Sequence, residues 1–357
     1  MKRATRAVAA VAALVTMTGA AQAYASPTSP DPDFDGDGVL TIHSASHDEV
    51  FADMAVLPDG KTMLLLVTQD EPAIELYRLR MSGAPDPTFG GGDGVFAFAL
   101  ASNYEQVALA VDPHSGKSYV STFLDNGTTS PTTVWRIKAD GTLDSAYGGV
   151  GTGHVLFNQR LVQGLVAQPD GKLLMAGSDF ADGEAKVWRL TNAGAPDSHF
   201  GTAGATVLST TISDEVSGIA LQSDDKVVVA GDHYSPTAST LLAFRLTKGG
   251  AFDPTFSGNG KAVVNPSTTG VTTSTLWSPD VLIRPDGRMV FVAGLNQSDG
   301  SFRNTLFLAG LRKGGSPDPA FGKHVYTGIS ETWGQAALER DGKVIVAGYL
   351  PPSPSTT

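Results

Sequence analysis

The feature that most constrains this chain is an internal repeat of about 55 residues. A short turn that ends in a basic residue occurs six times at this spacing, at Lys61, Lys117, Lys172, Lys226, Arg288 and Lys343. A second element, an Asp followed by an aromatic residue and glycines, alternates with the first and is centred on Phe34, Phe89, Tyr147, Phe200, Phe256 and Phe321. Because repeated units dictate an architecture before any single motif does, we expect an array of one supersecondary unit.

Each unit contains four short β-strand patterns separated by Gly and Pro. Apolar runs flank the basic turn, as in Met54–Leu57 before it and Val227–Gly231 after it, which is a strong hairpin signal. A third run carries an aromatic-Arg-aliphatic triplet, Tyr77–Leu79 in the first unit, which degenerates to Ala309–Leu311 in the fifth. A fourth run follows the glycine-rich turn, as in Val95–Phe98. The pattern predicts an all-β fold, a β-propeller of about six four-stranded blades.

The units resemble the delta-60 repeats of exported bacterial proteins, whose consensus is close to QPDGKIVVAG, then ARL, then LDxTFGxxG. Gln168–Gly177 and Leu143–Gly148 carry the match, and the resemblance extends over nearly the whole chain after its first segment. It implies a β-propeller. It implies no particular activity, because the family as a whole has no established reaction.

The half-units at the two ends predict how the ring closes. The N-terminal part supplies a fourth strand, Gly38–His43, and the C-terminal part supplies a first and a second strand, Gln335–Leu350. A sixth blade shared between the two ends is therefore expected, after five complete blades that start at about Glu49. Its third strand is missing, because the proline-rich segment Pro351–Thr357 cannot supply one. We expect an incomplete closing blade in which the N-terminal strand pairs with Val344–Gly348.

The first 25 residues have the layout of a secretory signal peptide. A basic start precedes the apolar stretch Ala7–Ala20, which is too short to cross a bilayer, and small residues offer cleavage sites near Ala23 or Ala25. Residues 26–32 then form an extended leader, 33–350 a single propeller domain and 351–357 a disordered tail. We expect a secreted, extracellular protein with no membrane insertion.

Composition excludes several classes of protein. The 357 residues include no Cys, which excludes disulfides, thiol nucleophiles and cysteine-ligated metals. The formal net charge of -11 argues against nucleic-acid binding, which concentrates Lys and Arg to displace counterions. No nucleophile elbow, zinc-protease motif or P-loop occurs. We therefore assign no catalytic residue and no organic cofactor, and expect a monomer.

The segment Asp31–Gly38 resembles the start of a calcium-binding loop, with Asp33, Asp35 and Asp37 at alternate positions. The twelfth position is Ser44, where such a loop needs a bidentate Glu. The segment also aligns with five other repeat turns. A repeat turn is therefore the favoured interpretation.

In four units, an Arg on the third strand lies eight residues before an Asp in the following turn. The pairs are Arg78 with Asp86, Arg136 with Asp144, Arg189 with Asp197 and Arg245 with Asp253. This spacing lets the guanidinium reach the carboxylate and fix the turn by a charge-assisted hydrogen bond. We predict one structural ion pair per blade, absent from the fifth, where Gly310 replaces Arg. A row of arginines for substrate is the less favoured interpretation.

The first strands supply a candidate metal site. If they line the axis, the positions twelve and eight residues before the basic turn residue bring carboxylates to the channel, at Glu49, Asp53, Glu105, Asp214, Asp280 and Glu331. Clustered carboxylates repel, raise one another's pKa or bind a cation, and Ca²⁺ is the one cofactor that the pattern suggests. Solvated strand ends beside a water-filled channel are the simpler interpretation.

Three function classes remain. The first is a noncatalytic exported propeller that presents variable loops to a protein or glycan. The second is a metal-assisted hydrolase or lyase at the channel, with His47 the histidine best placed to assist, and the third is a structural module of an envelope assembly. Variable loops on a repeated scaffold favour the first class, and they comprise Asp125–Thr133, Asp232–Thr240, Asn265–Pro279 and Asn296–Arg303. Trp277, in the longest of these loops, is the predicted ligand contact.

Overall fold

The computed structural model describes residues 35, 40, 42, 49–68, 72–100, 106–124, 129–149, 151–158, 160–211, 213–235, 239–266, 273–297, 305–327, 336–338 and 344–346. These residues form β-strands, turns and irregular segments without any helix. This part of the chain therefore offers no helix of the length and apolar character needed to cross a membrane.

Five sheets each contain four antiparallel strands in the order of the sequence. Blade 1 comprises β1 (Glu49–Val56), β2 (Thr62–Thr68), β3 (Ala73–Leu79) and β4 (Val95–Ala99). Blade 2 comprises β5 (Gln106–Val111), β6 (Ser118–Phe123), β7 (Thr132–Ile137) and β8 (His154–Phe157). Blade 3 comprises β9 (Arg160–Ala167), β10 (Leu173–Asp179), β11 (Glu184–Leu190) and β12 (Ala205–Ser209). Blade 4 comprises β13 (Asp214–Leu221), β14 (Val227–His233), β15 (Thr240–Leu246) and β16 (Lys261–Val264). Blade 5 comprises β17 (Thr273–Ile283), β18 (Met289–Gln297), β19 (Thr305–Leu311) and β20 (Lys323–Thr327).

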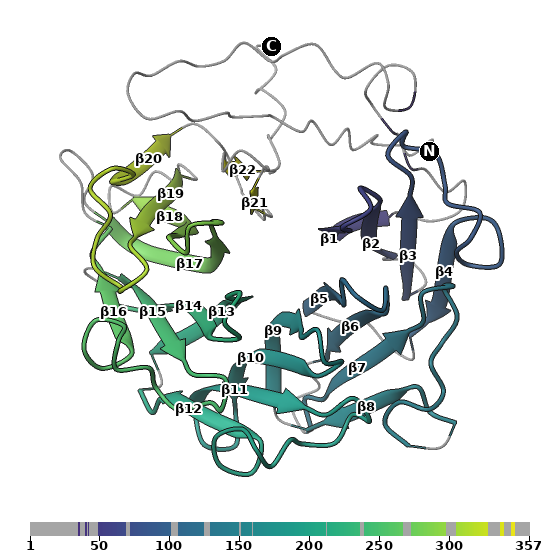
Figure 1. The fold of residues 1–357 in the computed structure, drawn as a ribbon, viewed down its shortest axis with the longest axis horizontal. Helices are drawn as coiled ribbons and strands as arrows, with labels where there is room; N and C mark the ends of the chain where they lie inside the picture. The colour runs from purple at the N-terminus through teal and green to yellow at the C-terminus, as the bar shows by residue number, and fades with distance from the viewer. Residues whose placement is uncertain are drawn as a thin grey trace, which may run out of the picture.

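The five sheets lie around a central axis, with the first strand of each sheet innermost (Figure 1). A sixth sheet pairs β21 (Ala336–Leu338) with β22 (Val344–Val346), and β21 contacts β17 of blade 5. The protein is therefore a β-propeller with five complete blades that start at Glu49, and the predicted fold class is confirmed. The two ends of every blade differ: the basic and aromatic turns lie at one end, which we call the turn face. The opposite end, where β2, β10 and β14 finish, is the loop face.

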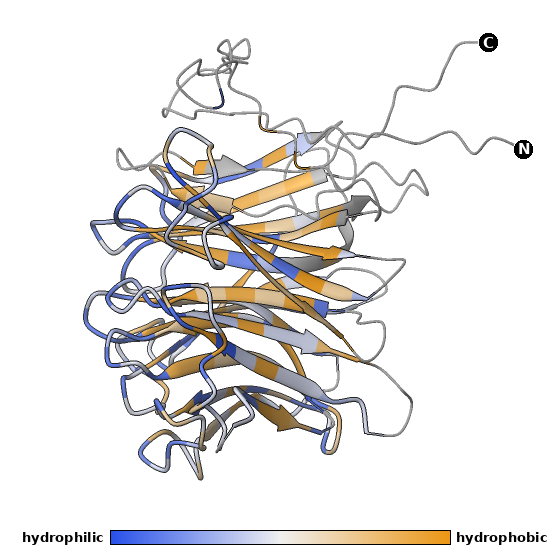
Figure 2. Ribbon diagram, turned by 90° about the vertical axis from the view of Figure 1, so that its right-hand side faces the viewer, coloured by the Kyte–Doolittle hydropathy of each residue, from blue (hydrophilic) through white to orange (hydrophobic). Residues whose placement is uncertain are grey.

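The hydrophobic core consists of five clusters, each between neighbouring blades. The middle strands are buried on both sides, so their sequences are continuous apolar runs such as Val227–Gly231, all of whose residues are buried. Figure 2 shows these apolar strands as orange layers, with the hydrophilic loops of the turn face at the left. The last cluster joins Val290 and Leu308 of blade 5 to Val344, which places the sixth sheet in the ring.

Blades also touch through their turns. The Gly90 N–H of blade 1 donates to the Asp140 carbonyl of blade 2 at 3.0 Å, and equivalent bonds join blades 2 to 3, 3 to 4 and 4 to 5. A Cβ atom at Gly141 would lie 2.3 Å from the Gly90 nitrogen, so this contact requires a residue without a side chain. The glycines of the repeat thus permit close approach between blades.

The N-terminal turn makes the same contact with blade 1. Asp35, which follows Phe34 as Gly90 follows Phe89, donates its N–H to the Ser82 carbonyl at 2.9 Å and has a φ of +50°. Asp35 therefore lies in a repeat turn at the seam, our term for the boundary between two neighbouring blades, next to blade 1. This is the place expected for a turn of the closing blade. Of the predicted N-terminal strand only Leu40 and Ile42 are described, and neither is in a strand. Its predicted pairing with Val344–Gly348 lies largely outside the described residues.

Candidate functional site

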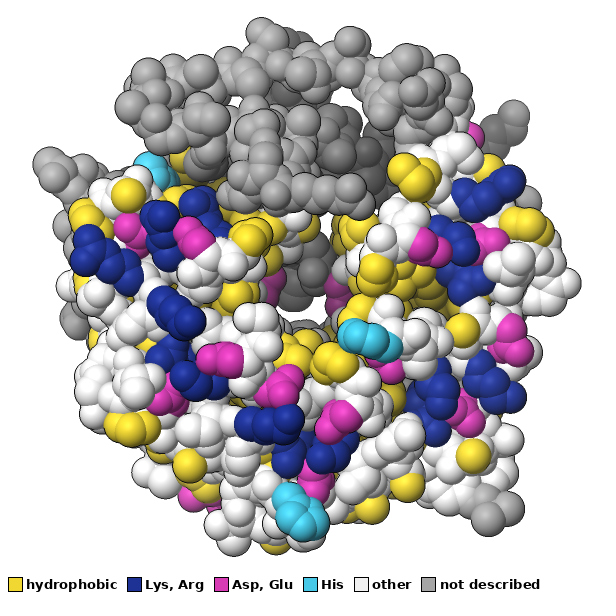
Figure 3. All heavy atoms as spheres, viewed as in Figure 1, with side chains coloured by type: hydrophobic (Ala, Val, Ile, Leu, Met, Phe, Trp, Pro, Cys, Tyr) yellow, Lys and Arg dark blue, Asp and Glu magenta, His cyan; other side chains and the backbone are white. Residues whose placement is uncertain are grey.

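The repeated charges of the turn face hold the blades together. All four predicted ion pairs form, with Nε to Oδ2 distances of 2.7 to 2.9 Å, in Arg78–Asp86, Arg136–Asp144, Arg189–Asp197 and Arg245–Asp253. The Oδ2 atom of each Asp also contacts the Lys Nζ of the preceding basic turn, as between Lys226 and Asp253 at 3.3 Å. Each guanidinium lies over the aromatic ring of its own turn and donates to a carbonyl of the next blade. Figure 3 shows the resulting alternation of basic and acidic side chains around this face.

These contacts set the protonation of the turn carboxylates. Burial alone would raise the pKa of Asp253, but hydrogen bonds from Thr255 and Lys226 and the charge of Arg245 lower it to about 2. Asp197 has the same arrangement and a pKa of about 2. The repeated cations are thus fully occupied with structural partners, which leaves no arginine row for substrate.

Blade 5 keeps this arrangement with different residues. Gly310 stands at the position of the Arg, and a Cβ there would lie 2.6 Å from the Phe321 Cβ, because the aromatic side chain fills the space. Arg288 of the basic turn reaches Asp318 at 3.3 Å, and Arg284 lies over the Phe321 ring at 5.1 Å. The predicted absence of the Arg pair is confirmed: Arg288 makes the contact that the turn lysines make in the other blades, and Arg284 takes the place of the missing guanidinium over the aromatic ring.

Two of the predicted channel carboxylates, Asp53 and Asp280, have raised pKa values. A bulge in β1 at Ala52 directs Asp53 into the seam with blade 2, where its Oδ2 accepts the Leu109 N–H at 2.7 Å and its Oδ1 the Met54 N–H at 2.6 Å. Burial raises the pKa of Asp53 to about 7 against these two donors, and the charge of Asp280 adds to the increase. Burial likewise raises the pKa of Asp280 to about 6, opposed by the N–H of Val281. Figure 3 shows acidic side chains at the central opening.

Asp214 has one partner on its own blade and one on blade 3. Its Oδ1 accepts from His233 Nδ1 at 2.5 Å, and its Oδ2 accepts from the Ser209 hydroxyl at 2.6 Å. The neighbouring Asp232 is buried, and burial together with the charges of Glu215 and Asp214 raises its pKa to about 7. In blade 3 the same register pairs Arg160 with Asp179 at 3.4 Å, so the acidic and the basic residue stand at exchanged positions in the two blades.

The remaining predicted metal ligands are not brought together by the described part of the chain. Glu105, Glu331 and His47 lie outside the described residues, and Glu49 is described by its backbone pairing with Thr68. Among the residues that the structure describes, no group of three His, Asp or Glu side chains has a geometry suited to a metal ion. The calcium site remains a prediction.

Trp277 was expected in a loop, and this is wrong: β17 starts at Thr273, and Trp277 pairs with Gly294 of β18. The run Thr273–Trp277 of β-branched and aromatic residues favours a strand over the loop that its Thr and Ser content suggested. Trp277 is placed near the loop-face start of the innermost strand. Described aromatic side chains at the same end are Phe51 at 40% exposure, Phe180 at 52% and Tyr234 at 51%.

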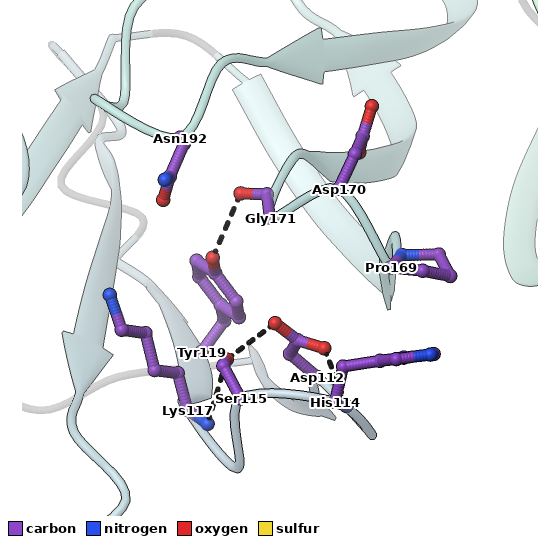
Figure 4. Close-up of a pocket in the computed structure, with 9 residues that line it drawn as sticks. All are labelled: Asp112, His114, Ser115, Lys117, Tyr119, Pro169, Asp170, Gly171 and Asn192. Atoms are coloured by element: carbon purple, nitrogen blue, oxygen red, sulfur yellow. Dashed lines mark hydrogen bonds between the residues drawn. The ribbon is translucent and has the colours of Figure 1, made fainter.

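A cleft of about 300 Å³ opens on the turn face between blades 2 and 3 (Figure 4). The cleft is lined by the basic turns of blades 2 and 3, by β6 and by the turn that follows β11. The lining residues are Asp112, His114, Ser115, Lys117, Tyr119, Pro169, Asp170, Gly171 and Asn192. The Tyr119 hydroxyl donates to the Gly171 carbonyl across the seam at 3.2 Å. None of the residues that line this cleft was predicted as a site residue from the sequence. Comparing the repeats position by position would have shown Tyr119 where other blades carry aliphatic residues.

Comparison with known proteins supports the fold. Residues 168–200 and 222–256 match the family described as "Domain of unknown function (DUF5122) beta-propeller". Both segments contain a basic turn, the two middle strands of a blade and the aromatic turn. The chain thus has the repeats of a β-propeller family. No curated protein matches the sequence.

Solved structures with a similar arrangement have distant sequences. Prolyl oligopeptidase B from Galerina marginata is 10% identical with a TM-score of 0.43, and the match covers 84% of this chain and 39% of that one. The β-propeller domain of the Trilobed protease from Pyrococcus furiosus is 11% identical with a TM-score of 0.42, over 86% of this chain and 79% of that one. An endo-1,4-beta-xylanase from Bacteroides thetaiotaomicron is 11% identical with a TM-score of 0.42, over 84% and 94%.

Proposed function

We propose that the chain is a noncatalytic, exported β-propeller of delta-60-like repeats that binds an extracellular protein or glycan through its loop face. The observation that supports this proposal is the contrast between the two ends of the blades. The repeated charges of the turn face satisfy one another, whereas the loop face carries the exposed aromatic side chains Phe51, Phe180 and Tyr234. Aromatic side chains supply large contact areas at low entropic cost and are enriched at interfaces.

Two of the three exposed aromatic residues come from neighbouring blades. Phe180 follows β10 and Tyr234 follows β14, and these strands belong to neighbouring blades 3 and 4. Phe180 also packs against Phe123 of blade 2 at a ring-centroid distance of 5.9 Å, which fixes its orientation. A rigid scaffold with aromatic residues at loop ends is the arrangement in which binding residues commonly occur.

The test is a ligand screen with matched variants. The secreted protein is applied to a glycan array and to crosslinking with extracellular proteins, and its mass checks cleavage near Ala23 or Ala25. The variants are Phe180→Ala with Tyr234→Ala, Trp277→Ala, and the control Met81→Ala, which removes a 73% exposed side chain from the turn face. We expect the ligand signal to be lost in the loop-face variants and retained in the control. A signal that every variant retains, or no ligand for the wild type, contradicts the proposal.

A further inference from the structure

The cleft between blades 2 and 3 departs from the repeat at several positions. Tyr119 occupies a position that is aliphatic in the other complete blades, at Met63, Leu174, Val228 and Val290. The basic turn of blade 2 is one residue longer, because the Gly116 N–H reaches back to the Asp112 carbonyl, whereas the Gly171 N–H of blade 3 reaches Gln168. The extra residue brings the exposed ring of His114 to the cleft.

Hydrogen bonds fix the walls of this cleft. The Asp112 carboxylate is buried and accepts the His114 N–H at 2.9 Å and the Ser115 hydroxyl. Opposite it, the Asn192 Oδ1 accepts from Arg136 Nη1 at 2.8 Å, which leaves the Asn192 amide N–H groups as donors toward the cleft. Figure 4 shows Tyr119 between these two walls.

The polar character continues beneath the cleft. The Tyr119 ring packs edge-on against Tyr147, with centroids 5.8 Å apart. Tyr147 stands where the other four complete blades have Phe, and its buried hydroxyl lacks a hydrogen-bond partner among the described residues. Both aromatic positions of this blade thus carry hydroxyl groups that the repeat does not need for packing.

The cations beside the cleft are already paired. Lys117 contacts Asp144 at 3.2 Å, and Lys172 contacts Asp197 at 3.3 Å and Asp170 at 3.3 Å. An anionic ligand such as a phosphate would have to compete with these carboxylates. A neutral ligand avoids that competition, and hydrogen-bonding groups rather than charges decide its binding.

We propose that this cleft binds a small neutral saccharide, independently of the loop face. Neighbouring sugar hydroxyls both donate and accept, so they match the exposed Asp170 carboxylate as acceptor and the Asn192 amide as donor. The exposed imidazole of His114 supplies a further polar contact. The volume of about 300 Å³ is at the lower end of the usual range of small-molecule sites, about 300 to 1,000 Å³, and suits one or two sugar rings.

The experiment is saturation-transfer NMR with the methyl glycosides of glucose, galactose, mannose and N-acetylglucosamine, followed by titration of any binder. Asp170→Asn removes the carboxylate with little change of shape, and its matched control is Asp59→Asn, at the same position of the blade 1 turn. We expect at least one glycoside to bind the wild type and the control alike. Asp170→Asn and Asn192→Ala are each expected to bind about tenfold more weakly, the effect of one lost hydrogen bond to a charged or buried group.

Three outcomes overturn this proposal. The first is that no glycoside binds the wild type. The second is that Asp170→Asn and Asn192→Ala bind the glycoside with wild-type affinity. The third is that the control Asp59→Asn weakens binding as much as Asp170→Asn does. The combined variant Phe180→Ala with Tyr234→Ala separates this site from the proposed loop-face site. If that variant loses glycoside binding while Asp170→Asn retains it, the cleft is not the binding site. The loop-face proposal can fail in its own screen without changing the result for the cleft.

Discussion

Two sets of buried carboxylates in this propeller have opposite pKa shifts. The turn-face set, Asp86, Asp144, Asp197 and Asp253, has an Arg and a Lys on each member, and its pKa values are lowered. The channel pair, Asp53 and Asp280, has backbone N–H donors but no cation among the described residues, and burial raises both pKa values. The same side chain thus stabilises the ring in one place and costs stability at neutral pH in the other.

Blade 5 shows which property of the turn-face set the fold needs. There Arg288 keeps the contact of the basic turn with Asp318, and Arg284 takes the place of the missing third-strand Arg over the Phe321 ring. The contact of the turn cation with the Asp and the presence of a guanidinium over the aromatic ring both persist without the third-strand Arg, and only the second of these comes from a new position. Tyr119, at the cleft between blades 2 and 3, departs from the repeat in another way, because its hydroxyl donates to the Gly171 carbonyl of the neighbouring blade.

The largest expected effect follows from breaking a turn-face pair. Arg245→Ala leaves the Asp253 carboxylate buried beside Lys226 alone and removes the hydrogen bond to the Lys313 carbonyl of blade 5. We expect a loss of about 3 to 5 kcal/mol in the free energy of unfolding, the usual cost of breaking a buried pair. Urea unfolding at pH 7 measures it. A loss below about 1 kcal/mol would show that this set is not structural.

The channel pair predicts a stability that falls as pH rises. Because the pKa of Asp53 is raised to about 7, its contribution is complete below pH 3.8, the ordinary value, and is lost as pH rises to 7. We expect Asp53 to account for about 3 to 4 kcal/mol of this fall. Unfolding curves of the wild type and Asp53→Asn between pH 4 and 8 test it. A fall of equal size in both proteins would contradict the assignment.

The turn-face set predicts the opposite slope in acid. The pKa values of Asp197 and Asp253 are lowered to about 2, so their contribution is present above pH 3.8 and is lost as pH falls toward 2. Each is expected to contribute about 1 to 2 kcal/mol. Thermal melting between pH 5 and 2 measures the loss, and Arg245→Ala should lose less than the wild type does. A melting temperature that is constant down to pH 2 would refute this prediction.

A smaller effect tests how blade 5 closed the space left by its missing Arg. Gly310→Ala places a Cβ against Phe321, whereas Gly249→Ala in blade 4 meets no atom within 4 Å. We expect a loss of about 1 to 2 kcal/mol for Gly310→Ala and a change within about 0.5 kcal/mol for the control. Equal effects of the two substitutions would show that Phe321 moves aside freely.

The repeat made the strands, the five complete blades and the four ion pairs predictable. An Arg eight residues before an Asp has the same geometry in the four units that carry it, so one pattern fixes four sites. The contact of Arg284 with Phe321 was not predictable, because it replaces a repeat residue from the basic turn, where the other blades carry no Arg. The pairing of Asp214 with His233 depends on cross-strand register. The cleft between blades 2 and 3 depends on one extra residue in the basic turn of blade 2 and on Tyr119 in place of an aliphatic residue. A search for residues that the repeats share does not detect either change.

Repeated residues hold the ring together, and the proposed function places ligand binding on non-repeated residues of the loop face. The dissociation constant of the ligand from the screen separates the two roles when it is measured for three proteins: the wild type, Phe180→Ala with Tyr234→Ala, and Arg288→Ala at the turn face. We predict binding at least about tenfold weaker in the loop-face variant, with an unchanged unfolding midpoint, and unchanged affinity in Arg288→Ala. Unchanged affinity in the loop-face variant together with weaker binding in Arg288→Ala would contradict the account.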